Sequence, residues 1–251
     1  MIDRKSPQAI ARMREAGSIL VSAMRVCREM AKPGVSTLEI DQEVESLIQH
    51  AKAKPAFKGY RGYPATICAS INEEVVHGIP AAHRRLKEGD IVGLDLGCIV
   101  DGYYADAAIT VPVGEVTPEV ERLLDVTRES LERAIAEVRP GNRLGDVSAA
   151  VQRHVEGAGL GVVRAFVGHG IGRQLHEDPQ IPNFGEPGKG PVLRPGMVLA
   201  IEPMVTMGHW GVRVLADHWT AVTEDGSWAA HFEHTVAVTE SAPDVLTREV
   251  D

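Results

Sequence analysis

Apolar residues recur at helical spacing near the start of the chain, at Ile10, Met13, Leu20, Met24 and Cys27. This spacing places them on one face and predicts an amphipathic helix over residues 7–30. Pro33-Gly34 follows, and because neither residue favours a helix interior, we expect the first helix to end there. Ser36, with Glu39 three positions later, is typical of a capping box, so a second helix is expected from there to about residue 52.

The middle of the chain predicts a hairpin followed by two more helices. Residues 53–64 are rich in Gly, Pro and Tyr, which indicates a loop. The pattern over residues 91–113 is typical of two apolar strands joined by a two-residue turn at Asp101-Gly102. Helical patterns then run from about 117 to 138 and from about 144 to 158.

The order helix, Pro-Gly, helix, strands occurs twice, and one offset of 107 residues (140 − 33) relates the two occurrences. The matching segments are Lys32-Pro33-Gly34 with Arg139-Pro140-Gly141, Glu39-Ile40 with Asp146-Val147, and Asp95 with Glu202. Such a repeat predicts two related halves, about 7–113 and 117–240, that face each other with a site between them. The alternative is a coincidence among common Pro-Gly turns.

Asp95 and Asp106 are carboxylates in otherwise apolar strands, where an isolated charge is costly unless it is paired or coordinated. A turn at Asp101-Gly102 would place Asp95 opposite Ala108. It would also place Asp106 opposite Gly97, so that both carboxylates leave the same face as diagonal neighbours, roughly 7–8 Å apart at Cα. From that distance both can reach a pair of metal ions roughly 3.5–4 Å apart. The alternative is a solvated strand face.

Three more residues extend this set of candidate ligands. Glu202 lies in the apolar segment 197–204, Glu233 precedes an alternating strand, and His169 stands between glycines. Singly, an exposed acid or a hydrogen-bonded core histidine would explain each of them. Together with the two aspartates they supply four carboxylates and one imidazole without a cysteine. That set suits Mn²⁺, Fe²⁺ or Co²⁺ better than a structural zinc site.

The composition limits the class of protein. The chain has 251 residues and a formal charge of −9, which fits a globular protein and argues against sequence-independent nucleic-acid binding. Three widely spaced cysteines define neither a disulfide framework nor a sulfur-rich metal site. The N-terminal residues lack the apolar stretch of a secretion signal, and the apolar runs are too short to cross a bilayer. We therefore expect a single cytoplasmic domain over residues 1–251 that does not contact membranes.

The most distinctive motifs are Ser70-Ile71-Asn72-Glu73-Glu74-Val75-Val76-His77-Gly78-Ile79-Pro80, Gly168-His169-Gly170-Ile171-Gly172 and Ala200-Ile201-Glu202-Pro203. With them, the chain resembles the type I methionine aminopeptidases of peptidase family M24 in their short bacterial form. The resemblance implies an α+β "pita-bread" fold, in which two pseudosymmetric halves pack helices on a curved antiparallel sheet. It also implies metal-dependent removal of the N-terminal methionine from nascent proteins and peptides, with preference for a small second residue.

The resemblance implies a role for each of the candidate metal ligands Asp95, Asp106, His169, Glu202 and Glu233. In the family pattern Asp106 and Glu233 bridge two divalent ions, which are Co, Mn, Fe, Zn or Ni. Glu202 would in addition be the general base for an attacking hydroxide that bridges the two ions. A monovalent cation near Asn72 is an optional addition.

Further residues match substrate-contacting positions of that family. His77 and His176 match two histidines that contact the scissile peptide and its developing charge. The positions that line the pocket for the methionine side chain are matched by Tyr60, Tyr63, Cys68 and Trp219. The chain departs from the commonest family residues at Phe57, Leu175 and His231. None of these departures removes a metal ligand. They leave open the shape of the pocket and which second substrate residues it tolerates.

The partner implied by the resemblance is the N-terminal methionine of nascent polypeptides near the ribosome, and the chain is expected to be a monomer. One alternative is a proline-directed relative of the prolidase or aminopeptidase P kind, which would cleave Xaa-Pro peptides instead. The other is a noncatalytic binding protein on the same fold, which no metal ion would activate.

Overall fold

The computed structural model describes residues 2–248 and contains four α-helices within that range. They are α1 (Pro7–Met30), α2 (Thr37–His50), α3 (Pro118–Ala136) and α4 (Leu144–Gly157). The sequence pattern predicts all four, with ends that agree to within two residues. Helix α2 ends earlier than expected, shortly before Lys52, whose left-handed backbone (φ 58°) cannot continue a right-handed helix.

Local capping interactions fix the starts of α1 and α2. The Ser36 hydroxyl accepts a hydrogen bond from the Glu39 amide at 3.2 Å, and the Glu39 carboxylate accepts one from the Ser36 amide at 2.8 Å. This confirms the predicted capping box. At α1, the Ser6 hydroxyl accepts from the Ala9 amide at 3.2 Å, just before Pro7. Each bond satisfies a backbone donor that the helix itself leaves without a partner.

The strands form one large sheet and two small ones, all with antiparallel pairing. The bounds are β1 (Lys54–Pro55), β2 (Ile67–Ile71), β3 (Glu74–Val76), β4 (Ile91–Val100), β5 (Tyr103–Pro112), β6 (Gly161–Val162), β7 (Gly168–Gly170), β8 (Glu177–Ile181), β9 (Val198–Ile201), β10 (Met204–Thr206), β11 (Val212–Val214), β12 (Ala221–Thr223), β13 (Ala229–His231), β14 (Glu233–Val238) and β15 (Pro243–Val245). The large sheet has the order β1-β4-β5-β14-β9-β7-β8, with β2 also on β4 and β15 also on β14. The small sheets have the orders β13-β10-β6 and β11-β12-β3.

The prediction of a loop over residues 53–64 is wrong in part. Strand β1 pairs Lys54 with Ile99 of β4, and Tyr60–Gly62 forms a 3₁₀ turn. This edge strand depends on a partner more than forty residues away, so the local Gly, Pro and Tyr content does not reveal it.

The predicted hairpin is confirmed in its register. Asp95 pairs with Ala108 and Gly97 pairs with Asp106, around the turn at Asp101-Gly102. Because side chains alternate between the faces of a strand, this register turns both aspartates toward the same face of the sheet.

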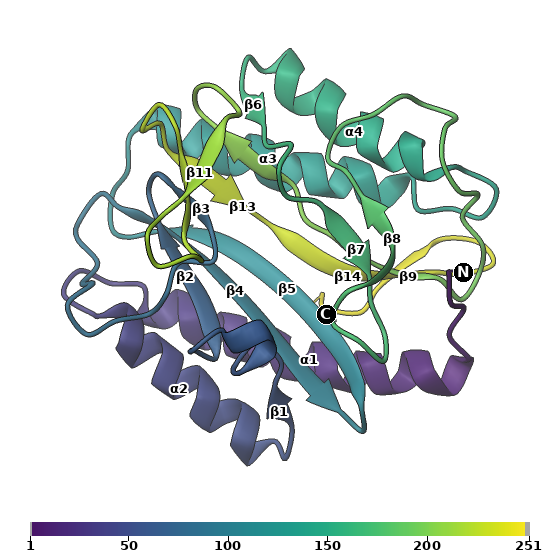
Figure 1. The fold of residues 1–251 in the computed structure, drawn as a ribbon, viewed down its shortest axis with the longest axis horizontal. Coiled ribbons are helices and arrows are strands. Elements are labelled where there is room, and N and C mark those ends of the chain that lie inside the picture. Colours follow the sequence, from purple (N-terminus) through teal and green to yellow (C-terminus); the bar gives the residue numbers. More distant parts are fainter. Residues whose placement is uncertain (1, 249–251) are drawn as a thin grey trace.

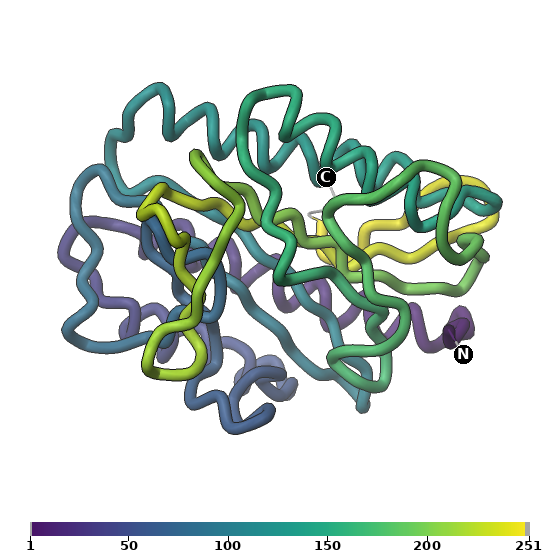
Figure 2. Tube along the Cα trace, turned by 45° about the horizontal axis from the view of Figure 1, so that its top comes forward, coloured from purple at the N-terminus to yellow at the C-terminus, as the bar shows by residue number. Residues whose placement is uncertain are grey.

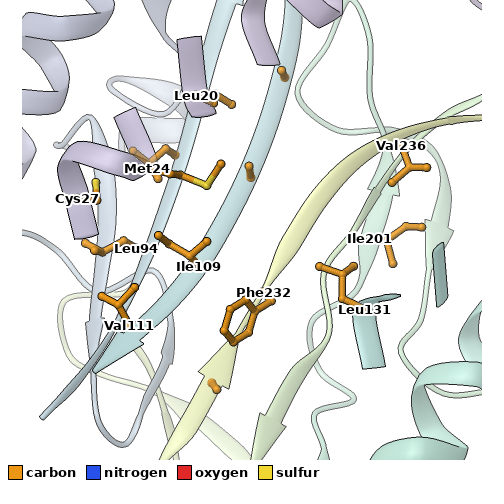
Figure 3. Close-up of a cluster of buried hydrophobic side chains, with 14 of the residues drawn as sticks. Leu20, Met24, Cys27, Leu94, Ile109, Val111, Leu131, Ile201, Phe232 and Val236 are labelled. Carbon is orange, nitrogen blue, oxygen red and sulfur yellow. The ribbon is translucent and has the colours of Figure 1, made fainter. Parts of the chain in front are cut away.

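The helices cover one side of the large sheet. Helix α1 packs on β4 and β5, while α3 packs on β9 and β14 (Figure 1). In the turned view of Figure 2, α3 and α4 run along the top of the molecule and α2 lies toward the bottom. In the core between the helices and the sheet, Met24 of α1 lies near Ile109, with Leu20 one turn away along the helix, and Leu131 of α3 lies beside Phe232 (Figure 3). Burial of this apolar surface leaves the opposite side of the sheet free to carry polar side chains.

Backbone hydrogen bonds recur at the offset seen in the sequence. The bond from the Gly34 amide to the Leu86 carbonyl (2.8 Å) is matched by one from Gly141 to Leu193 (3.1 Å). Each partner is displaced by 107 residues (141 − 34 and 193 − 86). The bridge between Ser36 and Arg85 recurs in the same way between Arg143 and Val192. The bounds of the two halves, 7–113 and 117–240 within one domain, stay a prediction.

Among residues 2–248, no helix combines the length and the apolar character that crossing a membrane requires.

Candidate metal centre and substrate pocket

All the candidate metal ligands and substrate-contacting residues line one cavity of about 180 Å³. They come from distant parts of the chain: Tyr60, Tyr63, Cys68, His77, Asp95, Asp106, His169, His176, Glu202, Trp219 and Glu233. The cavity has an acidic part at the strands of the large sheet and an apolar, aromatic part formed mainly by loops.

Strand pairing brings the acidic side chains together. Asp95 and Asp106 come from β4 and β5, and Glu233, the first residue of β14, pairs with Ala108 of β5. Thr235 joins β5 to β14, because its hydroxyl accepts from the Asp106 amide at 3.0 Å and donates to the Asp106 carbonyl at 2.7 Å. Asp106 therefore has a fixed backbone, and its side chain enters the cavity from the centre of the sheet.

Within residues 2–248, potential metal-binding atoms gather at Asp106, His169 and Glu233, whose donor atoms all lie within 4.8 Å of one another. Glu202 follows β9 at the edge of this group, with its Oε1 3.5 Å from Nε2 of His169. Nδ1 of His169 lies 3.0 Å from the Gly170 carbonyl, which can only accept a hydrogen bond. A neutral His169 therefore carries its proton on Nδ1 and directs the lone pair of Nε2 toward the carboxylates.

Burial shifts the pKa of every acid in the cluster upward, and for Asp106, Glu202 and Glu233 neighbouring carboxylates raise it further. Burial raises the pKa of Asp95 to about 7. The pKa values of Asp106, Glu202 and Glu233 lie well above the ordinary value, first because of burial and then because of the neighbouring carboxylates. In contrast, burial lowers the pKa of His169 to about 4, with a further contribution from His176. Without a cation, the cluster is thus an unfavourable collection of buried acids.

The donor atoms fit divalent cations. Asp95 Oδ1, Asp106 Oδ1 and Glu233 Oε1 are buried and have no hydrogen-bond partner. Buried polar atoms normally have a partner, because an unsatisfied one costs free energy. Carboxylate oxygens combined with one imidazole nitrogen suit ions such as Mn²⁺, Fe²⁺ or Co²⁺.

Two histidines and a tyrosine form the border between the acidic and the apolar part. The Tyr60 hydroxyl lies 2.9 Å from Nδ1 of His176, and the His176 ring lies 4.3 Å from the His169 ring. His77 directly follows β3, has a left-handed backbone (φ 62°) and lines the same cavity. Burial lowers the pKa of His77 to about 4, and burial followed by the charge of Arg61 lowers the pKa of His176. Both histidines are consequently neutral near pH 7.

The apolar part is built around the ring pair Tyr63–Trp219, whose centroids lie 5.0 Å apart in an edge-to-face arrangement. The Tyr63 hydroxyl lies 3.0 Å from the carbonyl oxygens of both Ile67 and Gly78, and these contacts fix the orientation of the ring. Cys68 pairs with Asp95 in the sheet, and burial raises the pKa of its thiol, which therefore stays protonated. This part of the cavity can accept an uncharged side chain.

Sequence reasoning missed several lining residues, which are Arg61, Val76, Phe166, Val167 and Met204. Arg61 directly follows Tyr60, and Met204 comes two positions after Glu202. Their nearness in sequence to predicted site residues could have identified them. Phe166 reaches the cavity by packing edge-on against His77, with centroids 5.4 Å apart, and no motif marks it. Of the departures from the family pattern, Phe57 and Leu175 line the cavity. His231 is buried with its Nε2 3.9 Å from Oε2 of Glu202.

The Asn72 side chain has a structural role. Its amide donates to the Asp90 carboxylate at 2.9 Å, and its carbonyl oxygen accepts from the Ile91 amide at 3.0 Å. Glu74 accepts from the Ile71 amide at 2.8 Å and pairs with Arg84. The monovalent cation near Asn72 stays a prediction.

Known proteins resemble this chain in sequence and in fold. Residues 11–240 match the model of metallopeptidase family M24. Methionine aminopeptidase 1 of Bacillus subtilis is 52% identical over 248 residues, which cover 99% of this chain and 100% of that protein. The crystal structure of methionine aminopeptidase from Thermotoga maritima is 51% identical, with a TM-score of 0.98 over 99% of this chain and 100% of that one.

More distant structures share the fold. Prolidase from Pyrococcus horikoshii is 23% identical, with a TM-score of 0.79 over 98% of this chain and 64% of that one. Together with the family model, these similarities confirm the predicted α+β pita-bread fold. The chain belongs to metallopeptidase family M24.

Proposed function

We propose that the chain is a methionine aminopeptidase, which removes the N-terminal methionine from polypeptides by metal-dependent hydrolysis. One observation carries this proposal: a cluster of buried acids with unpartnered oxygens opens directly into an apolar, aromatic slot within the same cavity. The sequence similarity to methionine aminopeptidases extends over nearly the whole chain and supports the same function.

In this proposal Asp95, Asp106, His169, Glu202 and Glu233 hold two divalent cations. Asp106 and Glu233 would be the ligands shared by both cations, which would be Co, Mn, Fe, Zn or Ni. When bound, they supply a nucleophilic water at neutral pH and polarise the scissile carbonyl. The unpartnered oxygens of Asp95, Asp106 and Glu233 support this assignment.

Glu202 is the proposed proton carrier. Its carboxylate is buried beside His169, and burial followed by the charge of Asp95 raises its pKa above the ordinary value, which suits a group that must both accept and release a proton. It takes the proton of the attacking water and passes it to the departing amine of the second substrate residue.

His77 and His176 are the proposed contacts to the peptide group. Because both are neutral near pH 7, each can donate one N–H to the oxygen on which negative charge develops. When the Tyr60 hydroxyl donates to Nδ1 of His176, Nε2 carries the proton and is the donor toward substrate. Tyr60 thereby sets the tautomer of His176.

The aromatic slot is the proposed site for the methionine side chain. Tyr60, Tyr63, Cys68 and Trp219 line it, and Phe57 and Leu175 lie at the same cavity. A thioether gains dispersion and sulfur–ring contacts there without needing a polar partner. A small second residue is expected to be preferred. Action on nascent chains near the ribosome as a monomer stays a prediction.

A peptide panel tests this function against the proline-directed alternative. Metal-loaded protein is incubated with Met-Ala-Ser, Leu-Ala-Ser, Met-Trp-Ser and an Xaa-Pro peptide, and the released amino acids are quantified. We expect rapid release of methionine from Met-Ala-Ser and little release from the other peptides. Cleavage of the Xaa-Pro peptide alone would support a prolidase-like activity, and the absence of any cleavage with Mn²⁺, Fe²⁺ or Co²⁺ would support a binding role.

A further inference from the structure

His176 lies on a short loop, residues 172–177, that connects β7 to β8. We call these residues the His176 loop. It leaves β7, presents Leu175 and His176 to the cavity, and enters β8 at Glu177. The conformation of this loop decides where the His176 ring lies.

The Glu177 carboxylate organises the backbone of the loop. Its Oε1 accepts hydrogen bonds from the amides of Arg173 at 2.7 Å and Gln174 at 3.1 Å. Both donors precede His176, and Glu177 follows it directly. These hydrogen bonds connect the two ends of the segment that carries His176. They restrain the loop only if the Glu177 carboxylate itself has a fixed position.

Lys5, from the segment before α1, holds that carboxylate. Nζ of Lys5 lies 2.5 Å from Oε2 of Glu177, and the two side chains are only 3% and 15% exposed. The ammonium group is also 2.7 Å from the exposed Asp3. The Lys5 stem passes directly over Gly172, where any larger residue would displace it. The Lys5 amide donates to the Gly196 carbonyl at 2.6 Å, which fixes the segment to the body of the protein.

We propose that Lys5 is a positioning residue, through which the N-terminal segment fixes the His176 loop and thereby the His176 ring in the cavity. The proposal rests on the substrate-contacting role of His176 given above. Nearly all of the Lys5 ammonium is withdrawn from water, so loss of either charge leaves the other buried with too few partners. The loop then relaxes toward solvent, and His176 moves with it.

The experiment uses the full-length, metal-loaded chain and two matched variants of the same segment. Lys5→Met keeps the length of the side chain and removes its charge. Arg4→Ala is the control, because Arg4 Nε donates to the Pro195 carbonyl at 2.7 Å and so anchors the same segment without any contact to the loop. The readouts are hydrogen exchange of the Arg173 and Gln174 amides, metal content, and kcat and KM for Met-Ala-Ser.

We expect Lys5→Met to accelerate exchange of the two amides and to lower kcat roughly tenfold, since small displacements of a catalytic contact are costly. KM should change by less than about threefold, because Leu175 of the loop is also held in the apolar cluster with Phe57 and Tyr63, and metal content should not change, because Lys5 does not belong to the acidic cluster. Arg4→Ala should leave exchange and kcat near the values of the unmodified chain. Glu177→Gln should reproduce Lys5→Met, and the double variant should lose no more activity than either single one.

Unchanged exchange in Lys5→Met would show that Lys5 does not fix the loop. Faster exchange with unchanged kcat would show that the loop does not position His176, and an equal loss of kcat in Arg4→Ala would assign the effect to general anchoring. Each of these results overturns the proposal. If the unmodified chain cleaves no peptide with any metal, the proposed function itself fails, while the exchange comparison still decides whether Lys5 fixes the loop.

Discussion

Nε2 of His169 lies 3.5 Å from Oε1 of Glu202, although 33 residues (202 − 169) separate them in the chain. Strand pairing accounts for this approach, because His169 of β7 pairs with Ala200 of β9, two positions before Glu202. Because the protonated Nδ1 of His169 donates to the Gly170 carbonyl, the lone pair of Nε2 faces the Glu202 carboxylate. Two electron-rich groups in this arrangement repel each other unless a proton or a cation lies between them.

Glu202→Gln tests the proton-carrier role. The amide keeps the size of the side chain but cannot accept and release a proton, so kcat for Met-Ala-Ser should fall at least about 100-fold. Circular dichroism should show an unchanged fold. The control is Glu29→Gln, which makes the same change on the exposed face of α1 and should retain full activity. Comparable activity in Glu202→Gln and the control would refute the assigned role.

Asp106→Asn tests the metal centre without relying on turnover. Ligands that bind only the folded state stabilise it, by about 2.7 kcal/mol at 100 times the dissociation constant. Saturating Mn²⁺ should therefore raise the Tm of the unmodified chain, and should raise that of Asp106→Asn by less than half as much. Asp101→Asn, at the exposed turn of the same hairpin, is the control and should respond like the unmodified chain. An equal Mn²⁺ response in Asp106→Asn would exclude Asp106 as a ligand.

The stability of the metal-free chain should fall as pH rises from about 6.5 to about 8. The raised pKa values of the clustered acids mean that the folded state binds more protons than the unfolded state there. The buried histidines, with pKa values lowered to about 4 in His77 and His169, act in the opposite direction. They do so only below about pH 6.5, where an unfolded histidine gains its proton. Urea unfolding in the presence of a chelator measures the trend.

Two controls make the pH dependence specific to the cluster. Asp106→Asn removes one of the coupled acids and should flatten the decrease in the free energy of unfolding. Saturating Mn²⁺ favours the charged carboxylates and should remove the decrease in the unmodified chain. A free energy of unfolding that rises with pH over this range in the metal-free protein would contradict the electrostatic description of the site.

Tyr60→Phe tests whether Tyr60 sets the tautomer of His176. Loss of the hydroxyl removes the 2.9 Å contact to Nδ1 and keeps the aromatic wall of the slot. The kcat for Met-Ala-Ser should fall about three- to tenfold, in proportion to one hydrogen bond, while KM and metal content stay nearly constant. A large rise in KM with constant kcat would instead make Tyr60 a simple binding contact.

The parts of the fold that depend on neighbouring residues were predictable. The register that turns Asp95 and Asp106 to one face follows from a two-residue turn at Asp101-Gly102, and the helix starts follow from local caps such as Ser36. The local settings of His169, Glu202 and Glu233 mark each as a candidate ligand, and motif resemblance supplied His77, His176 and the pocket residues. The approach of His169 to Glu202 depends on the pairing of β7 with β9, which the local settings do not show.

The parts that depend on distant contacts were not predictable in the same way. Strand β1 forms only because Lys54 meets Ile99, and Phe166 reaches the cavity only through its packing on His77. Nothing near Lys5 in the sequence indicates a bond to a carboxylate 172 residues away. Such contacts form only when segments far apart in the chain pack together, which no local pattern encodes.

The most direct test of the central claim is a titration of metal-free protein with Mn²⁺, with release of free methionine from Met-Ala-Ser measured at each step and Glu202→Gln run in parallel. The account predicts no release without metal, a rise to full activity as Mn²⁺ binds, and no comparable rise in Glu202→Gln although that variant still folds. Methionine release that is independent of metal, or no release at any Mn²⁺, Fe²⁺ or Co²⁺ concentration, would contradict it.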